Sequence, residues 1–432
     1  MIKKILLFLL ISNFSLQAFA EEKELNNTTE KSLETTGSNP FSQTKFIPDI
    51  SLILDSSYIY RDLKIDDFNN TRTINGFGSL ERYINSKNNI NLNYGELAFT
   101  ATVDPFFDLS TYFHLSEFGF EIEEAYATTR SLPAGFQIKA GKFLSEFGRI
   151  NSKHAHSWNF NDQSLIYSAL LSEHGLLEKG LQINYLAPFN FYFLMGSEIF
   201  AGENEKSFGT KGFTIGTNKL EEVNIPNLYT GYLKTSFDLD NLTILGGLSY
   251  AGGGIRATEE KEAASTGHTH NHGATSTEAA SEGFAGGTNL FGVDLTARYD
   301  INSYSYLSLQ NEILKRYISG SKYMANDRIA SNKEQSGLYS ELVYKISNEW
   351  KLGLRYDLIF QNDVYENKNK IETNNNLSRY SAMLEYNTSE FARFRLQYNH
   401  DRAGYLENKL QPVNEIMLNM NIVIGSHSAH AF

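Results

Sequence analysis

Apolar and polar residues alternate over long runs of this chain, and this pattern restricts its fold more than any other feature. From Trp350 to Phe360, every second residue is large and apolar or aromatic, and Lys351, Arg355 and Asp357 lie between them. The run from Ala392 to Asp401 alternates in the same way. A period of two places one class of side chain on each face of a β-strand. We therefore expect an all-β chain of long antiparallel strands.

The connections between these runs alternate between short and long. Short turns are expected at Pro105–Asp108, Pro133–Gly135, Pro188–Asn190, Asp238–Asn241, Ile301–Ser303, Ser347–Glu349 and Asn387–Glu390. Long loops are expected at Lys64–Lys87, Asn151–Glu178, Gly202–Asn227, Gly252–Gly286, Ser319–Gln335 and Gln361–Asn376. This alternation is typical of outer-membrane barrels, with short turns in the periplasm and long loops outside. It predicts a transmembrane β-barrel of about 16 strands, a size that leaves an aqueous channel.

In such a barrel the apolar face of each strand meets lipid and the charged face lines the lumen. A soluble sandwich is the alternative, because it also alternates, with its apolar faces turned inward. The chain has 25 tyrosines and 30 phenylalanines against 7 prolines, which favours strands in either case. The length, the aromatic strand ends and the export signal described next favour the membrane barrel.

The first residues have the features of a secretory signal. Two lysines precede an apolar run, and Ala18-Phe19-Ala20 forms a cleavage site. A membrane anchor is the alternative, but it needs about 20 apolar residues. We expect a signal peptide at residues 1–20, a disordered periplasmic leader at 21–48 and the barrel at 49–425. Residues 426–432 form a short tail that contains histidine.

Charge and cysteine content exclude several classes of protein. Removing the signal leaves 36 basic residues (38 − 2) against 50 acidic ones, a balance of −14. Nucleic acid is therefore not an expected partner. The chain has no cysteine, so the exported protein holds together without disulfides. We find no nucleophile and base with a recognisable spacing, and we expect neither an enzyme nor a required cofactor.

Histidines gather in the expected long loop Asn151–Glu178. His154 and His156 are two residues apart, so in an extended segment both imidazoles point the same way and could share a metal. His174, with Glu173 and Asp162, could complete the site. Imidazole suits zinc, copper, nickel and iron alike, so the metal is not fixed. The alternative is a hydrogen-bonded turn packed in a constriction.

Two further histidine groups lie outside that loop. His268, His270 and His272 occupy a low-complexity stretch at 253–286, which we expect to be mobile and to capture metal weakly. The alternative is that these histidines have no role and reflect random changes in the sequence of an unconstrained loop. His427 and His430 lie in the tail, where their spacing shares a face only on a helical turn. A periplasmic metal site and a structural tail are both open there.

The expected lumen face carries both signs of charge, which favours modest ion selectivity over a dedicated anion track. Its members are Arg316, Lys345, Lys351, Arg355, Arg393, Arg395, Glu312, Glu341, Asp357 and Glu385.

Several segments resemble a family of porin-like outer-membrane proteins that are often labelled zinc-regulated outer-membrane receptors. The segments are VDPFFD (103–108), EIEEAYATTRSLPAGFQIKAGKF (121–143), FGRINSKHAHSWNFNDQ (147–163), EHGLLEKGLQINYLAP (173–188) and the ending GSHSAHAF. More distantly, the GKF strand with its FG turn is similar to phosphate-selective porins. The resemblance implies uptake of zinc or a related metal, with His154, His156, His427 and His430 as the recurring histidines.

The family label often adds dependence on the energy-transducing TonB system. A TonB-dependent receptor carries a plug inside a barrel of about 22 strands. Only Glu21 to Pro48 lies between the signal and the first expected strand, so no plug is expected.

From these observations we expect a Gram-negative outer-membrane porin in which Asn151–Glu178 folds partly into the lumen as a constriction. The sharper hypothesis is passive uptake of zinc or another divalent transition metal, bound only transiently by the loop histidines. An anion-selective or general solute porin with structural histidines is the first alternative, and a surface-binding barrel is the second. Membrane lipids and small solutes are the expected partners, and a homotrimer is compatible with a porin of this size.

Overall fold

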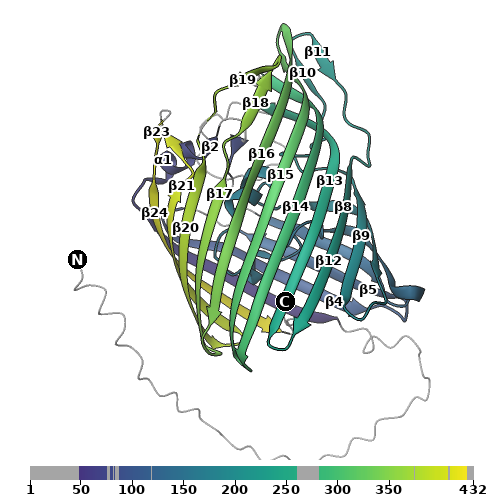
Figure 1. Ribbon diagram of the computed structural model, residues 1–432, viewed down its shortest axis with the longest axis vertical. Helices are drawn as coiled ribbons and strands as arrows, with labels where there is room; N and C mark the ends of the chain where they lie inside the picture. The colour runs from purple at the N-terminus through teal and green to yellow at the C-terminus, as the bar shows by residue number, and fades with distance from the viewer. Residues whose placement is uncertain are drawn as a thin grey trace, which may run out of the picture. The chain divides into compact units, whose positions relative to one another are not determined.

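A computed structural model describes residues 48–74, 78–80, 82, 87–117, 119–259, 282–373, 375–406 and 409–425. Sixteen long strands within these ranges form one closed antiparallel sheet (Figure 1). They are β1 (Asp49–Arg61), β4 (Asn89–Thr102), β5 (Phe107–Ser116), β6 (Gly119–Thr129), β7 (Phe136–Leu144), β8 (Leu177–Leu186), β9 (Tyr192–Phe200), β12 (Leu228–Leu239), β13 (Leu242–Glu259), β14 (Glu282–Asn302), β15 (Ser305–Met324), β16 (Asp327–Lys345), β17 (Trp350–Ile359), β20 (Leu377–Ser389), β21 (Ala392–Arg402) and β24 (Val413–Gly425).

Each wall strand pairs with its neighbour in the chain, and the first strand closes the barrel by pairing with the last. β1 lies between β4 and β24, with Leu52 opposite Ile424 on one side and Leu97 on the other. Closure satisfies every strand edge, which a spanning sheet requires in lipid. The prediction of an all-β, antiparallel barrel of 16 strands is confirmed.

Several short strands lie within the long loops of the barrel. They are β2 (Thr73–Ile74), β3 (Gly78–Ser79), β10 (Phe213–Ile215), β11 (Asn218–Leu220), β18 (Asp363–Glu366), β19 (Asn369–Ile371), β22 (Tyr405–Leu406) and β23 (Lys409–Leu410). Two helices accompany them, α1 (Ile65–Thr71) and α2 (Leu165–Leu171). Neither of these described helices is long or apolar enough to cross a membrane.

The two faces of the wall are inverted relative to a soluble protein. On β21, Leu396 is 46% exposed on the outside, whereas the neighbouring Arg395 is 1% exposed on the inside. On β24, Leu418 is exposed and Asn419 is buried. An apolar exterior around a polar interior is what a barrel in lipid requires. The soluble sandwich, whose apolar faces are inward, is therefore wrong.

Two of the expected loops are too long. The prediction of a loop at Ser319–Gln335 is wrong, because β15 continues to Met324 and β16 begins at Asp327. The expected loop at Gly252–Gly286 is shortened in the same way, since β13 runs to Glu259 and β14 starts at Glu282. Backbone pairing needs no apolar side chain, so the ladder continues through polar residues once it has started.

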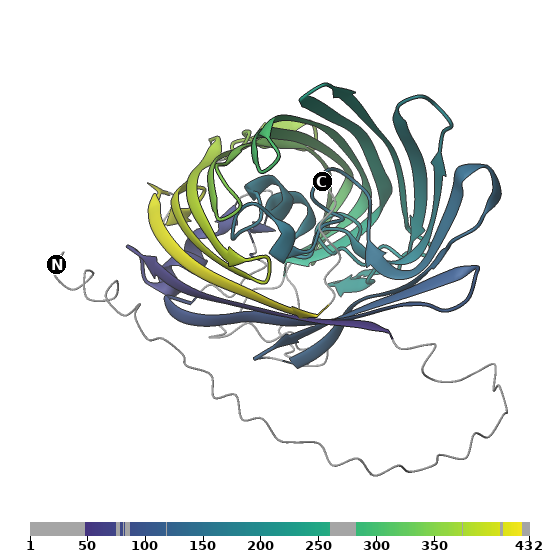
Figure 2. The same ribbon diagram turned by 90° about the horizontal axis from the view of Figure 1, so that it is seen from below.

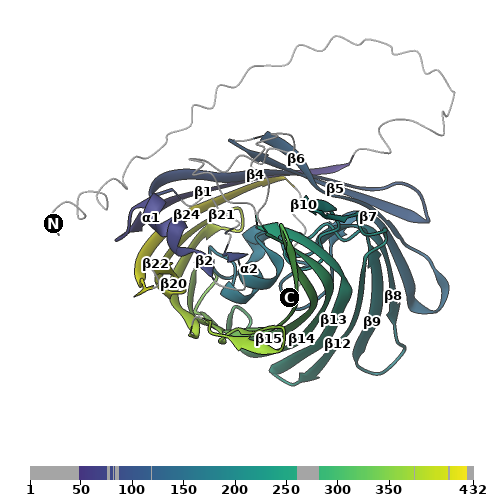
Figure 3. The same cartoon turned by 90° about the horizontal axis from the view of Figure 1, so that it is seen from above.

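The segment between β7 and β8 (residues 145–176) lies inside the barrel, and we call it the inner loop. Its helix α2 appears within the ring of strands when the barrel is viewed from below and from above (Figures 2 and 3). All seven residues of α2 are buried, and the helix packs against β16 and β17. Phe143, Phe147 and Leu170 belong to one apolar cluster that joins the inner loop to the wall. The lumen is therefore partly filled on this side.

Candidate functional site

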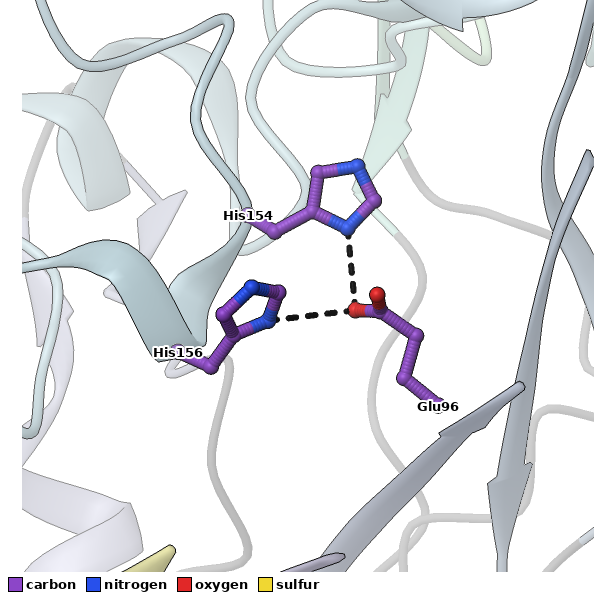
Figure 4. Close-up of side chains that lie close together, drawn as sticks. All are labelled: Glu96, His154 and His156. Carbon is purple, nitrogen blue, oxygen red and sulfur yellow. Dashed lines mark hydrogen bonds and ion pairs between the residues drawn. The ribbon is translucent and has the colours of Figure 1, made fainter. Parts of the chain in front are cut away.

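Three side chains converge where the inner loop meets the wall near β4. The ligand atoms of Glu96, His154 and His156 lie within 4.8 Å of one another (Figure 4). The Nδ1 atom of His154 is 2.9 Å from Oε2 of Glu96, and Nδ1 of His156 is 3.3 Å from the same oxygen. All three side chains are largely shielded from solvent. We call this group the Glu–His cluster.

A β-bulge turns Glu96 toward the lumen. Asn91 and Asn93 face inward on β4, so unbroken alternation would place Glu96 on the lipid side. The register of β4 against β1 slips by one residue at Asn93, which leaves Tyr94 and Glu96 buried on the inside. A bulge adds one residue to a strand and so reverses which face the following side chains occupy.

A second bulge, in β6, places two consecutive carboxylates inside. Tyr112 of β5 pairs with Glu124 and the next residue pairs with Ile122, so Glu123 has no partner in the ladder. Both Glu123 and Glu124 are buried, at 6% and 5% exposure. Adjacent residues on a regular strand point to opposite faces, so only the bulge allows both to line the lumen.

His154 lies among these carboxylates. Its Nε2 atom is 2.5 Å from Oε1 of Glu124, and its Nδ1 atom is 3.7 Å from Oε2 of Glu123. Burial alone would lower the pKa of His154, but the carboxylates around it, Glu96 first, raise the pKa well above the usual 6.5. The surrounding carboxylates therefore favour the protonated, cationic form of His154.

The backbone around the two histidines differs from the predicted extended segment. Residues Ala155–Ser157 form a 3-10 turn that follows an extended His154. Ser157 donates its hydroxyl to the carbonyl of His154 (2.7 Å), and the Trp158 indole donates to the carbonyl of Lys153 (3.1 Å). The convergence of the two imidazoles thus comes from a tight turn rather than from strand alternation.

Asp162 does not join the histidines, and the expectation that it completes a metal site is wrong. Its carboxylate accepts from Arg355 (2.7 Å) and Gln397 (2.7 Å) and pairs with Arg379 (2.8 Å). Arg82 lies 3.6 Å away. A carboxylate that is already neutralised by buried guanidinium groups is a poor metal ligand. Asp162 instead ties the inner loop to β17, β20 and β21.

His174 lies at the far end of the inner loop. Its Nε2 atom is 3.3 Å from Oε1 of Glu173, and this pair is separate from the Glu–His cluster. His174 and Glu173 line a small cavity together with His154, Glu123 and Lys153. Burial would lower the pKa of His174, but Glu173 raises it above the usual value. The remaining predicted histidines, His268, His270, His272, His427 and His430, lie outside the described residues.

Most of the predicted lumen charges do point inward. Arg355, Arg395, Glu312 and Glu385 are among the buried residues of the described wall. They bind one another or the inner loop: Glu385 accepts from Arg395 at 2.6 Å, and Glu312 accepts from Tyr167 of α2 at 2.8 Å. These charges hold the loop and the wall together rather than facing open water.

Glu96, Glu123 and Glu124 were not predicted as site residues from the sequence. The sequence does contain a signal for these residues, because the alternation of polar and apolar side chains breaks in both strands. EIEEAY has two adjacent acidic residues, and NLNYGEL has an aromatic residue directly after a polar one. Such breaks mark bulges, and bulges are common next to functional sites. The donor set of two imidazoles and one carboxylate fits zinc and related divalent metals.

No family model matches the chain. Among solved structures, OmpT of Vibrio cholerae is similar with a TM-score of 0.49 and 12% identity, covering 88% of this chain and 99% of that one. DcaP of Acinetobacter baumannii has a TM-score of 0.49 and 10% identity, over 89% and 99%. OprB of Pseudomonas putida has a TM-score of 0.49 and 12% identity, over 88% and 95%. Likenesses this distant carry no argument about function.

The descriptions of these proteins do not name zinc, so the zinc-receptor part of the resemblance stays a prediction, whereas its barrel fold is what the structure shows. A protein of Aquifex aeolicus (strain VF5), described as an uncharacterized protein, is 45% identical over 399 residues. The match covers 91% of this chain and 82% of that protein. This chain therefore belongs to the same family as the Aquifex aeolicus protein.

Proposed function

We propose that the protein is a passive outer-membrane channel that admits divalent transition metal ions, with zinc as the leading candidate, through the Glu–His cluster. The observation that carries this proposal is the convergence of Glu96, His154 and His156 inside the barrel. A bulge in β4 and a tight turn assemble that geometry, and a second bulge in β6 places Glu124 beside His154.

The surroundings of His154 support metal binding. Glu124 holds the Nε2 side of the ring, which leaves Nδ1 directed at Glu96 and His156. Metal-bound histidines commonly use one ring nitrogen for the metal and give the other to a carboxylate. At neutral pH the metal must displace the proton of His154. Competition with this proton, and an incomplete ligand set, keep binding weak enough for release, as conduction requires.

An aqueous path beside the inner loop is also needed. A cavity of about 410 Å³ lies between the loop and β12 to β14, lined by Arg149, Lys234 and Asp294 among others. Lys234 pairs with Glu146, and Asp294 lies near Arg149, so both signs of charge face this space. None of Glu96, His154 and His156 lines this cavity, so we assign to it the access of water and ions to the inner loop, while the metal is bound at the Glu–His cluster.

The same cavity supports a second candidate function, a porin for small anionic solutes. The Nε atom of Arg149 is buried and has no hydrogen-bond partner among the described residues. A guanidinium with one unsatisfied N–H at the edge of a cavity suits a carboxylate or phosphate. In this version the histidines only brace the loop. A surface-binding barrel, the third possibility, needs no conduction at all.

Single-channel recording separates these candidates. The refolded protein is recorded with and without micromolar zinc, and so are Glu96→Gln and the double variant His154→Ala with His156→Ala. His400→Ala serves as a matched control, because His400 lies on β21 and bonds Asn414 instead of the Glu–His cluster. We expect zinc to block or modulate the conductance of the wild type and of the control, but not the conductance of either cluster variant.

Equal conduction without any zinc effect would reject metal entry and favour the anion porin. A shift of the reversal potential by Arg149→Gln in a salt gradient would then support that second candidate. Absence of conductance in a folded wild type would leave only the surface-binding function.

A further inference from the structure

The outside of the barrel carries a groove that the proposed channel function does not use. It crosses β7, β8, β9, β12, β13 and β14, which lie side by side in Figure 3. The groove has a volume of about 740 Å³ and is lined mainly by outward apolar side chains, among them Phe136, Ile183, Leu233 and Phe291. This volume is in the range of sites that hold small organic molecules, roughly 300 to 1,000 Å³.

Small residues form the floor of the groove. Ser197 of β9 and Gly231 of β12 are directly opposite each other in the ladder, and both face outward. Larger side chains rise on either side, with Met195 opposite Leu233 one pair along and Tyr250 opposite Phe291 across β13 and β14. A regular barrel presents a convex row of such side chains, so the small pair makes a local depression.

The floor presents no polar group that lacks a partner. The hydroxyl of Ser197 donates to the carbonyl of Thr230 at 2.9 Å. The backbone groups of Ser197 and Gly231 are engaged in the antiparallel ladder between β9 and β12. An occupant therefore meets mainly hydrocarbon over a floor of satisfied polar groups, which selects an apolar ligand over a polar one.

An aromatic group fixes the position of the groove relative to the membrane surface. Phe189 and Phe191 lie at the short turn between β8 and β9, and their rings stack at 5.5 Å. Phe191 also stacks on Phe237 of β12 at 4.9 Å. Aromatic rings in this arrangement mark the membrane interface of a barrel on the side of the short turns. Phe237 is four residues beyond Leu233, about 13 Å along the strand.

We propose that this groove holds one acyl chain of a phospholipid from the leaflet on the short-turn side, with its headgroup beside the phenylalanines at the β8–β9 turn. Outer-membrane barrels place short turns in the periplasm, so this is the inner leaflet. The bilayer surrounds the apolar belt and supplies the ligand at high concentration. A second copy of this chain is the competing occupant, and the experiment below distinguishes it from a lipid.

The test fills the groove by one substitution. A Cβ atom at Gly231 would meet only a backbone oxygen of Gly196, at 4.0 Å, so Gly231→Leu projects into the groove without a backbone clash. Gly287→Leu is the matched control. Gly287 also faces outward, its Cβ would meet only a backbone oxygen of Gly253 at 3.7 Å, and it is not a groove residue.

Both variants and the wild type are extracted from outer membranes, washed extensively with detergent, and examined by native mass spectrometry and by phospholipid extraction. Heat-dependent migration on gels verifies that each barrel is folded. We expect the wild type and Gly287→Leu to retain a stoichiometric phospholipid and Gly231→Leu to lose it. Equal retention by all three proteins would overturn the proposal, and so would a wild type without phospholipid. A change of oligomeric state in Gly231→Leu with no lipid on the wild type would assign the groove to a second copy instead.

Discussion

Asp162→Asn tests whether a single carboxylate holds the inner loop against the wall. Asp162 lies in the loop, whereas the groups that it binds come from β17, β20 and β21. It accepts from Arg355 and Gln397 at 2.7 Å and pairs with Arg379 at 2.8 Å. Asparagine keeps the size of the side chain but removes its charge, so the guanidinium groups stay buried with less compensation.

The structure sets the size of the effect. Breaking a buried ion pair by removing one partner costs about 3–5 kcal/mol. We use the lower end of this range, because in Asp162→Asn the carboxylate of Asp357 still accepts from Arg355 (2.9 Å) and from Arg379 (3.2 Å). A loss of about 3 kcal/mol corresponds to about a 150-fold shift between docked and displaced loop, at 1.36 kcal/mol for each factor of ten.

Bilayer recording and urea unfolding measure this shift. We expect Asp162→Asn to show frequent steps between conductance levels, which reflect loop displacement, and a lower unfolding midpoint. Glu221→Gln is the control, because Glu221 pairs with Lys219 on the surface at 80% side-chain exposure, and exposed pairs contribute little. If Asp162→Asn records and unfolds like this control, the carboxylate does not anchor the loop and the reasoning fails.

Three further predictions concern the same loop. Burial would raise the pKa of Asp162, but Arg379, Arg355 and Arg82 outweigh burial and hold this pKa below its usual value. The stability that the Asp162 carboxylate contributes is therefore complete above about pH 4 and declines below it. Loop displacement in recordings should rise in this acid range, and the same rise in Asp162→Asn would show that Asp162 is not its cause. Gly148→Ala should destabilise the protein by about 1–3 kcal/mol in urea, because Gly148 has a φ of +69° and a Cβ would lie 2.3 Å from Oε1 of Glu312; Gly246→Ala, with no contact under 3.7 Å, should not. Glu124→Gln should weaken zinc block by about 10- to 100-fold as an outer carboxylate of His154, and an unaltered block would remove Glu124 from the site.

Local sequence patterns are sufficient to predict the barrel. A period of two is a local property, so the runs at Trp350–Phe360 and Ala392–Asp401 show which side chains share a face without any knowledge of their neighbours. Turn residues are equally local, which is why the strand count came out right. Loop lengths were less accurate at Ser319–Gln335, because pairing with a neighbouring strand extends a ladder through polar residues that carry no strand signal of their own.

The geometry of the site depends on contacts between parts of the chain that are far apart in sequence. A break in alternation within one strand indicates a bulge, but only the register against the partner strand shows that the slips lie at Asn93 and Glu123 and that Glu96 faces inward. The role of Asp162 depends on Arg355, which is 193 residues away in the chain. The sequence shows that histidines and acidic residues share one loop. Which of them come into contact depends on partners that are far away in the sequence. The physical reason is that the pairing of a buried charge depends on all the groups around it at once, whereas the face that a strand residue occupies depends only on its two neighbours in the sequence.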